Sequence, residues 1–286
     1  MYVDLHMHSN CSDGALSPEE LVALCAENGV RLMSLTDHDT MEGSTRARVA
    51  AQARGIAFIN GIEISTLWGG SGIHVVGLGL DPESPGLAQF LSGTSGKRLE
   101  RGQAMDEKLA ALGIHGALEG ALRFADHSTS LSRTHFALWL LEAGHVKTYQ
   151  EAFDRFLRPG RPAYVDVAWP GTEEAVKFIV REGGVAVLAH PGRYRFAAEW
   201  MHDELLRAFQ AAGGEAIEVT SGSQPREADV LYAQRAREMG FLASTGSDWH
   251  SARSPRPGPG LQPTLPTGIT PVWTRFGFPE NLAELE

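Results

Sequence analysis

The sequence YVDLHMHSNCSDG, residues 2–14, places a short apolar strand directly before two histidines and an aspartate. In a β-strand, residues i and i+2 point to the same face, so the imidazoles of His6 and His8 are expected to approach one ion. Gly14 permits the turn that returns Asp13 toward them. This stretch therefore predicts a strand that ends in metal-ligating side chains.

Strand-like runs of the same kind recur along the chain, and most are followed by an amphipathic helix. They are brief, apolar or β-branched, and bounded by glycine or polar residues, which is typical of buried parallel strands. They cover 2–5, 31–35, 56–64, 73–80, 185–189, 216–220 and 241–244. This alternation predicts an α/β fold with a mainly parallel sheet. Seven strands suit either a closed barrel or an open doubly wound sheet, and periodicity does not choose between them.

The helix between the first two strands has clear boundary signals. Ser17-Pro18-Glu19-Glu20 places an N-cap serine before a proline at the first helical position, with a glutamate three residues after the cap. Gly29 suits the end of this helix, because glycine adopts the left-handed conformation without strain. Further helices of the alternating pattern are predicted over 44–53, 173–181, 199–211 and 226–239.

Residues 96–162 have helical patterns and no convincing strand. Helices are predicted there over 97–112, 118–125, 134–143 and 149–157. We therefore divide the chain into a strand–helix part, formed by 1–95 and 163–286, and a helical insertion over 96–162. From residue 254 onward the chain is rich in proline, which predicts an extended segment on the surface.

Most of the histidines lie at the ends of predicted strands. In parallel α/β folds the carboxyl ends of the strands share one rim, and ligands bind there. One histidine at such an end is more often a packing residue, but this larger set of histidines and carboxylates indicates a metal site. The set comprises His6, His8, His38, Glu63, His74, His190, Asp248 and His250. Glu63 stands in the apolar run GIEIS, where a buried carboxylate needs a cation or a proton.

His38 stands between two acids in the run TDHDT, residues 36–40. Asp37 and Asp39 suit a role as outer partners that orient the imidazole. Asp39 suits equally well the N-cap of the helix that follows. The sequence leaves both roles open.

Composition narrows the classes of function. The chain has 25 basic and 35 acidic side chains and a net charge of −10, which disfavours tracking along a nucleic-acid backbone. A short anionic substrate remains compatible, because bound metal ions reverse the local field. Two cysteines without a C-x-x-C motif predict a reducing compartment. The N-terminus lacks signal-peptide features and no apolar run approaches about 18 residues. We expect a cytoplasmic protein that contacts no membrane, and no stable protein partner is indicated.

Taken together, these motifs resemble the polymerase and histidinol phosphatase (PHP) family. The family signature consists of H-x-H followed by D, then T-D-H, G-x-E, H-P and S-D-x-H. Here the motifs stand as His6-Met7-His8 with Asp13, Thr36-Asp37-His38, Gly61-Ile62-Glu63, His190-Pro191 and Ser247-Asp248-Trp249-His250. The resemblance spans 1–95 and 163–286. It implies a distorted seven-stranded β/α barrel with a helical insertion over the active site.

Within the family the chain is most similar to bacterial enzymes with a helical insertion, the 3′,5′-nucleoside bisphosphate phosphatases and the 5′-to-3′ exoribonucleases. By matching position, the resemblance implies one metal on His6, His8, Glu63 and Asp248, and a second on Glu63, His74 and His190. A third group, of Asp13, His38 and His250, binds a third metal or the phosphate. These nitrogen and oxygen ligands suit Mn²⁺, Fe²⁺ or Zn²⁺. We expect two or three manganese ions.

The implied reaction is hydrolysis of a phosphate ester by a metal-bound hydroxide, which needs no protein nucleophile. For a nucleoside 3′,5′-bisphosphate, the 3′-phosphate would lie on the metals and the products would be a nucleoside 5′-monophosphate and phosphate. The alternatives are exonucleolytic cleavage of short 5′-phosphorylated RNA at the same site, another phosphoester substrate, and a metal-stabilised binding module. The catalytic residues are expected to be Glu63, Asp13, His38 and His250.

A small substrate with two phosphates needs a second anion site, which we expect in the insertion. Arg133 and His135 lie at a predicted helix start, where backbone amides and an arginine suit a phosphate. Lys97, Arg98 and Arg101 form a second basic group on another predicted helix. We expect Arg98, Arg101, Arg133 and His135 to bind the phosphate that is not hydrolysed, although solvated helix charges of this kind are common.

Overall fold

In the computed structural model, which describes residues 2–253 and 256–282, the strands form two sheets. The smaller sheet is parallel and contains, in this order, β1 (Tyr2–Asp4), β2 (Val30–Met33) and β3 (Ala57–Phe58). The larger sheet contains, in this order, β4 (Gly61–Trp68), β5 (Ser71–Leu78), β6 (Val185–Leu188), β7 (Ala216–Ser221) and β8 (Leu242–Gly246). The fold is therefore mixed α/β.

Isolated bridges connect the two sheets. Met7 pairs with Trp249 after the ends of β1 and β8, and His38, which follows β2, pairs with Glu63 within β4. The expected single barrel of seven strands is thus not what the backbone pairing shows, since the described residues form eight strands in two sheets. The bridges nevertheless bring residues from both sheets to one common rim.

The expected strand over 56–64 is instead two strands, β3 and β4, and β5 runs antiparallel to its neighbour β4. The connection between β4 and β5 is the pair Gly69 and Gly70, with φ of 56° and 77°. A two-residue hairpin turn of this kind needs positive φ at both positions, which glycine supplies at no cost. The Gly-Gly pair between two strand-like runs was the signal for a hairpin. β5 is also antiparallel to β6, whereas β6, β7 and β8 are parallel as predicted and β4 runs in their direction, so β5 is the reversed strand of this sheet.

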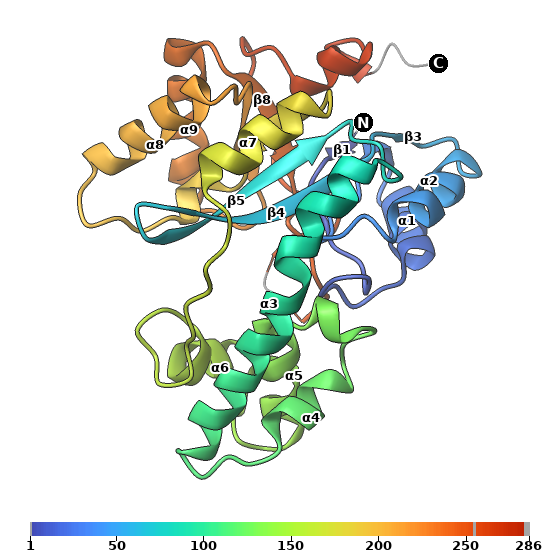
Figure 1. Cartoon of the computed structure of the whole chain (residues 1–286). Coiled ribbons are helices and arrows are strands. Elements are labelled where there is room, and N and C mark those ends of the chain that lie inside the picture. Colours follow the sequence, from blue (N-terminus) through green and yellow to red (C-terminus); the bar gives the residue numbers. More distant parts are fainter. Residues whose placement is uncertain (1, 254–255, 283–286) are drawn as a thin grey trace.

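The helices of the strand–helix part lie close to their predicted positions and cover both sheets (Figure 1). They are α1 (Pro18–Glu27), α2 (Ser44–Gln52), α7 (Thr172–Arg181), α8 (Trp200–Ala211) and α9 (Arg226–Met239). The predicted capping box of α1 is present, because Ser17 accepts from the Glu20 amide and the Glu20 carboxylate accepts from the Ser17 amide. α1 and α2 lie beside the smaller sheet, and α8 and α9 lie beside the larger one.

The insertion is a separate group of helices with its own apolar core. Figure 1 shows α3 running from the sheets down into this group. Its helices are α3 (Pro85–Ala110), α4 (Ala117–Leu122), α5 (Arg133–Glu142) and α6 (Tyr149–Ala152), the last followed by a π-turn over Phe153–Leu157. α3 begins earlier than predicted and belongs to both parts, since Leu87 packs in the core of the larger sheet and Met105 in the core of the insertion.

The C-terminal tail follows the prediction of an extended segment except for a 3-10 turn at Val272–Phe276. The Gln262 side chain donates to the Val3 carbonyl oxygen at 2.7 Å, which fixes the tail against β1. Residues 254–255 and 283–286, which the prediction of the tail included, lie outside the described residues. Both cysteines, Cys11 and Cys25, are buried and carry free thiols. Across the described part of the chain, every helix is too short or too polar to cross a membrane.

The middle of α3 offers a test of helix stability. Gly93 and Gly96 lie inside the helix, and a Cβ at either position would meet no atom within 4 Å. Because glycine in a helix costs about 0.5–1 kcal/mol relative to alanine, Gly93→Ala with Gly96→Ala should raise the free energy of unfolding by about 1–2 kcal/mol. Urea unfolding followed by circular dichroism measures this change. Gly102→Ala in the same helix is the control and should destabilise, since its Cβ would lie 2.3 Å from Leu131.

Candidate metal centre

The ends of β1 and β8 bring the first histidines to the last carboxylate. The Asp248 amide donates to the His6 carbonyl oxygen at 2.8 Å, and the His8 amide donates to the Trp249 carbonyl oxygen at 3.0 Å. This pairing places His8 Nε2 at 3.3 Å from Asp248 Oδ1, and His6 Nε2 at 3.8 Å from the same oxygen. Three predicted ligands from opposite ends of the sequence therefore share one position.

Glu63 lies at the centre of the cluster and is fully buried. Five imidazoles surround its carboxylate, with a ring nitrogen of each between 2.8 and 3.3 Å from one of its oxygens. They belong to His6, His8, His38, His74 and His190. Glu63 lies near the start of β4 and not near the end of a strand as predicted, whereas His74 lies within its strand, β5, as predicted. The antiparallel hairpin is what sets these two side chains beside each other.

A further group of predicted ligands lies next to Glu63. His250 Nε2 is 3.4 Å and His38 Nε2 is 3.9 Å from Asp13 Oδ1. The rings of His8 and His250 approach to 4.1 Å between centroids. All nine predicted ligands thus converge, although His38 lies closer to Glu63, at 2.9 Å, than to Asp13, at 3.9 Å.

The donor atoms of this cluster suit cations. Four groups of ligand atoms each lie within 4.8 Å of one another: His8, Asp13, His38 and His250; His6, His8 and Asp248; His6, Glu63 and His190; and His38, Glu63 and His74. Several buried donor atoms make no hydrogen bond within the described protein, among them His6 Nε2, both ring nitrogens of His8, and Asp13 Oδ1. Orphaned buried polar atoms are costly, and metal ions would satisfy them.

The protonation states of Glu63 and His190 also suit metal binding. Burial alone would raise the pKa of Glu63, but the imidazoles of His38, His6 and His74 hold that pKa well below its usual value. Burial, together with Arg193, lowers the pKa of His190 to about 3. A metal needs an ionised carboxylate and a neutral imidazole, which these two residues present near neutral pH.

Glu218 is a buried residue of this centre that the sequence analysis missed. Its carboxylate lies 3.3 Å from His6 Nδ1 and accepts from the His190 amide at 2.6 Å. Outer partners of this kind fix the orientation of a ligating imidazole. The signal was available, because Glu218 interrupts the apolar run AIEVT of β7 in the same way as Glu63 interrupts GIEIS.

Backbone strain is concentrated at the centre. Apart from glycine, the described residues with positive φ are Asp39, His190 and Asp248, at 54°, 30° and 51°. Conformations of this kind cost free energy and persist only where surrounding contacts impose them. His190 is held by Glu218, and the Asp39 carboxylate accepts from the Ser65 amide at 2.7 Å.

The acids that flank His38 have other partners than those expected. Asp37 accepts from the Ser9 amide at 2.8 Å and from the Ser12 hydroxyl at 2.6 Å, so it fixes the loop after β1. Asp39 does not cap α2, whose N-cap is Gly43 without a side-chain hydrogen bond. Asp39 instead forms an ion pair with Arg98.

Two of the four predicted phosphate-binding residues have partners inside the protein. Arg98 is 4% exposed and bound to Asp39, with its guanidinium over the ring of Trp169. His135 is buried, and its Nδ1 accepts from the Ser132 amide at 3.1 Å. Burial lowers the pKa of His135 to about 4, so the ring is neutral near pH 7. Both side chains therefore have structural roles.

The other two, Arg101 and Arg133, have no ion-pair partner among the described residues. Arg101 lies over Trp169 at 5.8 Å, and Arg133 lies over Tyr164 at 5.8 Å. Burial, followed by repulsion from Arg133 and Arg98, lowers the pKa of Arg101 to about 9. Half-buried guanidiniums that repel each other would be stabilised by a bound anion.

Two further arginines, which the sequence analysis also missed, contact a predicted ligand directly. Arg193 and Arg256 each place Nη1 at 2.8 Å from Asp248 Oδ2. Burial would raise the pKa of Asp248, but Arg256, His8 and Arg193 are among the groups that hold it well below its usual value. They add positive charge to the edge of the cluster.

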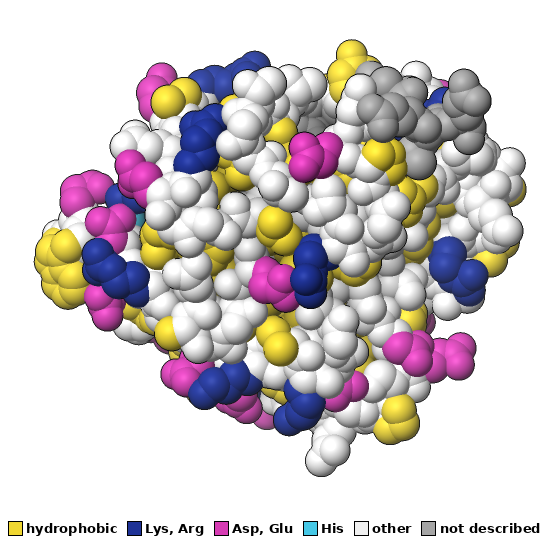
Figure 2. All heavy atoms as spheres, turned by 90° about the horizontal axis from the view of Figure 1, so that it is seen from above, with side chains coloured by type: hydrophobic (Ala, Val, Ile, Leu, Met, Phe, Trp, Pro, Cys, Tyr) yellow, Lys and Arg dark blue, Asp and Glu magenta, His cyan; other side chains and the backbone are white. Residues whose placement is uncertain are grey.

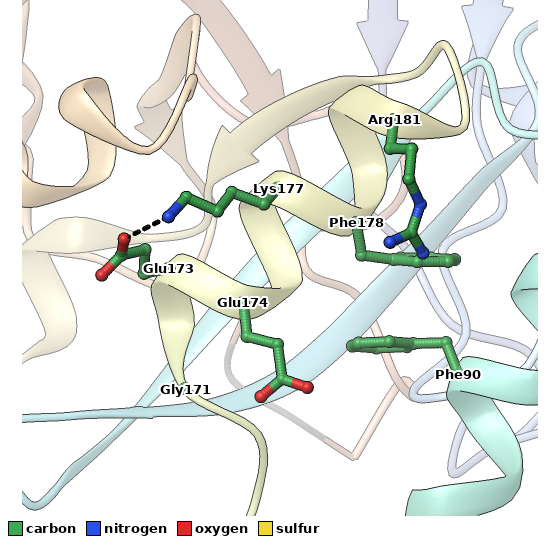
Figure 3. A pocket seen from close by; sticks show the side chains of 7 residues that line it. All are labelled: Phe90, Gly171, Glu173, Glu174, Lys177, Phe178 and Arg181. Atoms are coloured by element: carbon green, nitrogen blue, oxygen red, sulfur yellow. Dashed lines mark hydrogen bonds and ion pairs between the residues drawn. The ribbon is translucent and has the colours of Figure 1, made fainter.

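Two other surfaces of the described structure differ from the metal centre, and neither presents a cluster of predicted ligands. A pocket of about 530 Å³ between α3 and α7 is lined by Phe90, Phe178 and exposed helix charges, and contains none of the predicted ligands. Figure 3 shows the stacked rings of Phe90 and Phe178, with centroids 4.2 Å apart, which anchor the start of α3 to α7. The face seen in Figure 2, turned away from the insertion, carries acidic and basic side chains interspersed. The predicted ligands lie instead at the rim that faces the insertion.

Comparison with known proteins finds relatives that agree on the family and on the hydrolysis of phosphoesters. Residues 4–158 match the PHP domain. A 3′,5′-nucleoside bisphosphate phosphatase of Chromobacterium violaceum is 44% identical over 271 residues, which cover 95% of both chains. The 5′-3′ exoribonuclease Rnm of Escherichia coli is 38% identical over 289 residues, which cover 99% of this chain and 96% of its own. The solved structure of a candidate metal-dependent phosphoesterase from Bifidobacterium adolescentis has a TM-score of 0.82 at 27% identity, covering 96% of this chain and 94% of its own.

Proposed function

Since the chain belongs to the PHP domain family and is a metal-dependent phosphoester hydrolase, we propose that it removes the 3′-phosphate from nucleoside 3′,5′-bisphosphates. The products are a nucleoside 5′-monophosphate and phosphate. The observation that supports this proposal is the presence of two separate candidate phosphate-binding sites. One is the cluster around Glu63, and the other is the pair Arg101 and Arg133, which has no carboxylate partner among the described residues.

The nine predicted ligands are proposed to hold two or three divalent ions. Because Glu63 contacts His6, His8, His74 and His190, it would be shared between an ion on His6, His8 and Asp248 and an ion on His74 and His190. Asp13, His38 and His250 form a further group with His8. Bound ions supply charge that polarises the phosphoryl oxygens and a water that ionises near neutral pH. Nitrogen and oxygen donors without a thiolate support manganese, with iron and zinc as the other candidates.

The protein's own groups are proposed to orient the reacting phosphate. Glu63 and His38 each belong to two of the groups of ligand atoms, and Asp13 and His250 share a group with His38, so we assign these four residues the catalytic role. No covalent intermediate on the protein is required. Burial, with the nearby charge of Asp37, raises the pKa of Cys11 to about 11, so this thiol is protonated and is a poor nucleophile.

Arg101 and Arg133 are proposed to bind the 5′-phosphate. A guanidinium makes two parallel hydrogen bonds to a phosphate, and its affinity increases where water is partly excluded. Arg98 then supports the site by holding Asp39, and His135 supports it by capping α5. Both were predicted as substrate contacts, and we now propose that they act through their neighbours.

The second candidate is 5′-to-3′ exonucleolytic cleavage of short 5′-phosphorylated RNA. A 3′-phosphate and the 3′ diester of an oligonucleotide present the same atoms to the metal cluster, and the first nucleotide would keep its 5′-phosphate on the arginines. The similarity to the exoribonuclease Rnm supports this activity. One enzyme with this geometry would carry out both reactions.

The test measures products from two substrates with Mn²⁺-loaded enzyme. Adenosine 3′,5′-bisphosphate is incubated beside 5′-phosphorylated di- and trinucleotides, and kcat/KM is determined for each. We expect the bisphosphate to be hydrolysed faster and enzyme dialysed against chelator to be inactive. Faster cleavage of the oligonucleotides would make the exonuclease the main activity. No turnover of either substrate with metal bound would refute both.

A further inference from the structure

The two oxygens of Asp13 have different surroundings. Asp13 Oδ1 faces the imidazoles of His250 and His38 and accepts no hydrogen bond. Asp13 Oδ2 accepts from the hydroxyls of Ser132 and Thr134, each at 2.9 Å. The carboxylate is therefore oriented, with one oxygen toward the predicted metal group and the other bound to two donors.

Both donors belong to the insertion. Ser132 is the N-cap of α5, and its hydroxyl also accepts from the Thr134 amide at 3.0 Å. The hydroxyl of Tyr149, at the start of α6, lies 3.4 Å from Thr134 Oγ1 and can donate to it. Thr134 Oγ1 then accepts from Tyr149 and donates its own proton to Asp13 Oδ2. The same helix is anchored in the core of the insertion by Phe136 and Leu140.

We propose that Ser132 and Thr134 are positioning residues that connect the insertion to the metal group of His8, Asp13, His38 and His250. The inference rests on the proposed function only in that this group binds a metal. Hydroxyl donors to Oδ2 keep Oδ1 in the orientation that an ion needs, and outer partners of this kind contribute about 10–100-fold to metal affinity. By reciprocity, an ion bound at Asp13 strengthens the attachment of α5.

Thr134→Val tests this inference, because valine keeps the shape of threonine and removes the hydroxyl. Thr134→Ser, which keeps the hydroxyl, is the matched control. Ser132 is left unchanged, because its loss would also remove the cap of α5. Binding of Mn²⁺ is measured without substrate, by electron paramagnetic resonance of the free ion. We expect the weakest bound Mn²⁺ to lose about tenfold in affinity in Thr134→Val, and less than twofold in Thr134→Ser.

A second measurement reports the coupling to the insertion. Hydrogen exchange at residues 131–143 should slow when Mn²⁺ is added to the unaltered protein and to Thr134→Ser, and change little in Thr134→Val. Equal Mn²⁺ affinity in all three proteins, or an equal loss in both variants, would overturn the inference. Equal unfolding midpoints of the three metal-free proteins would show that any difference arises from the metal group. Because no substrate is present, a failure of the proposed phosphatase activity would leave these results unchanged.

Discussion

Glu63→Gln is expected to lower kcat/KM by about 10³-fold or more and to reduce the amount of bound metal. Glutamine has almost the same shape but carries no charge, and Glu63 is the carboxylate that five imidazoles surround. A loss of 10³-fold corresponds to about 4 kcal/mol of transition-state stabilisation, which is in keeping with removal of a charged ligand shared by two ions. Phosphate release and metal content by mass spectrometry check the two results.

Glu218→Gln is the matched control for this prediction. Glu218 is an equally buried carboxylate that contacts His6 and His190 but belongs to none of the predicted metal groups. Its loss should weaken metal binding by about 10–100-fold, so enzyme with excess Mn²⁺ should regain most of its activity. Full activity and full metal content in Glu63→Gln would refute the assignment of Glu63 as the shared ligand.

Arg133→Ala is expected to lower kcat/KM for adenosine 3′,5′-bisphosphate by about 100-fold, with a change of less than about threefold for adenosine 3′-monophosphate. The larger loss corresponds to about 2.7 kcal/mol, typical of two charge-assisted hydrogen bonds to a phosphate. The monophosphate has no 5′-phosphate for Arg133 to bind, so its rate of hydrolysis depends on the metal centre and not on Arg133. Steady-state assays on the two substrates measure the difference.

Arg123→Ala is a suitable control, because Arg123 also lies in the insertion but forms an exposed ion pair with Glu142. It should leave both substrates unaffected, since exposed ion pairs contribute little. If Arg133→Ala weakened both substrates equally, Arg133 would not bind the 5′-phosphate. Arg133→Lys should recover part of the affinity, since it keeps the charge and loses the planar pair of donors.

The ligand positions could be predicted from the sequence because each lies within or just beyond an apolar run. His6, His8 and Asp248 follow β1 and β8, and their convergence required only the general rule for strand ends. Glu63 was identified because it is a carboxylate in an apolar strand. It was predicted near the end of that strand, and it lies near the start of β4. The same rule applied to β7 would have found Glu218.

The direction of β5 was predicted wrongly because the sequence analysis followed the repeated strand–helix pattern and did not use the hairpin signal of Gly69 and Gly70. The arginines were harder to assign, since a sequence does not show which guanidiniums find a carboxylate. Arg98 and Arg101 lie three residues apart on α3, yet Arg98 pairs with Asp39 and Arg101 has no such partner among the described residues. That difference depends on the contact between α3 and the loop that contains Asp39, 59 residues before Arg98 in the sequence.

The continuous helix α3 makes the spatial relation of the two parts depend on how many residues it contains. Leu87 is fixed in one core and Met105 in the other. A helix turns about 100° and rises about 1.5 Å per residue, so one residue added between these two would rotate the whole insertion by about 100°. Ser132 and Thr134 would then leave Asp13, and Arg101 and Arg133 would turn away from the rim. The helical phase of α3 is thus as strict a requirement as the identity of the ligands, and changes in insertion size belong in the loops beyond this helix.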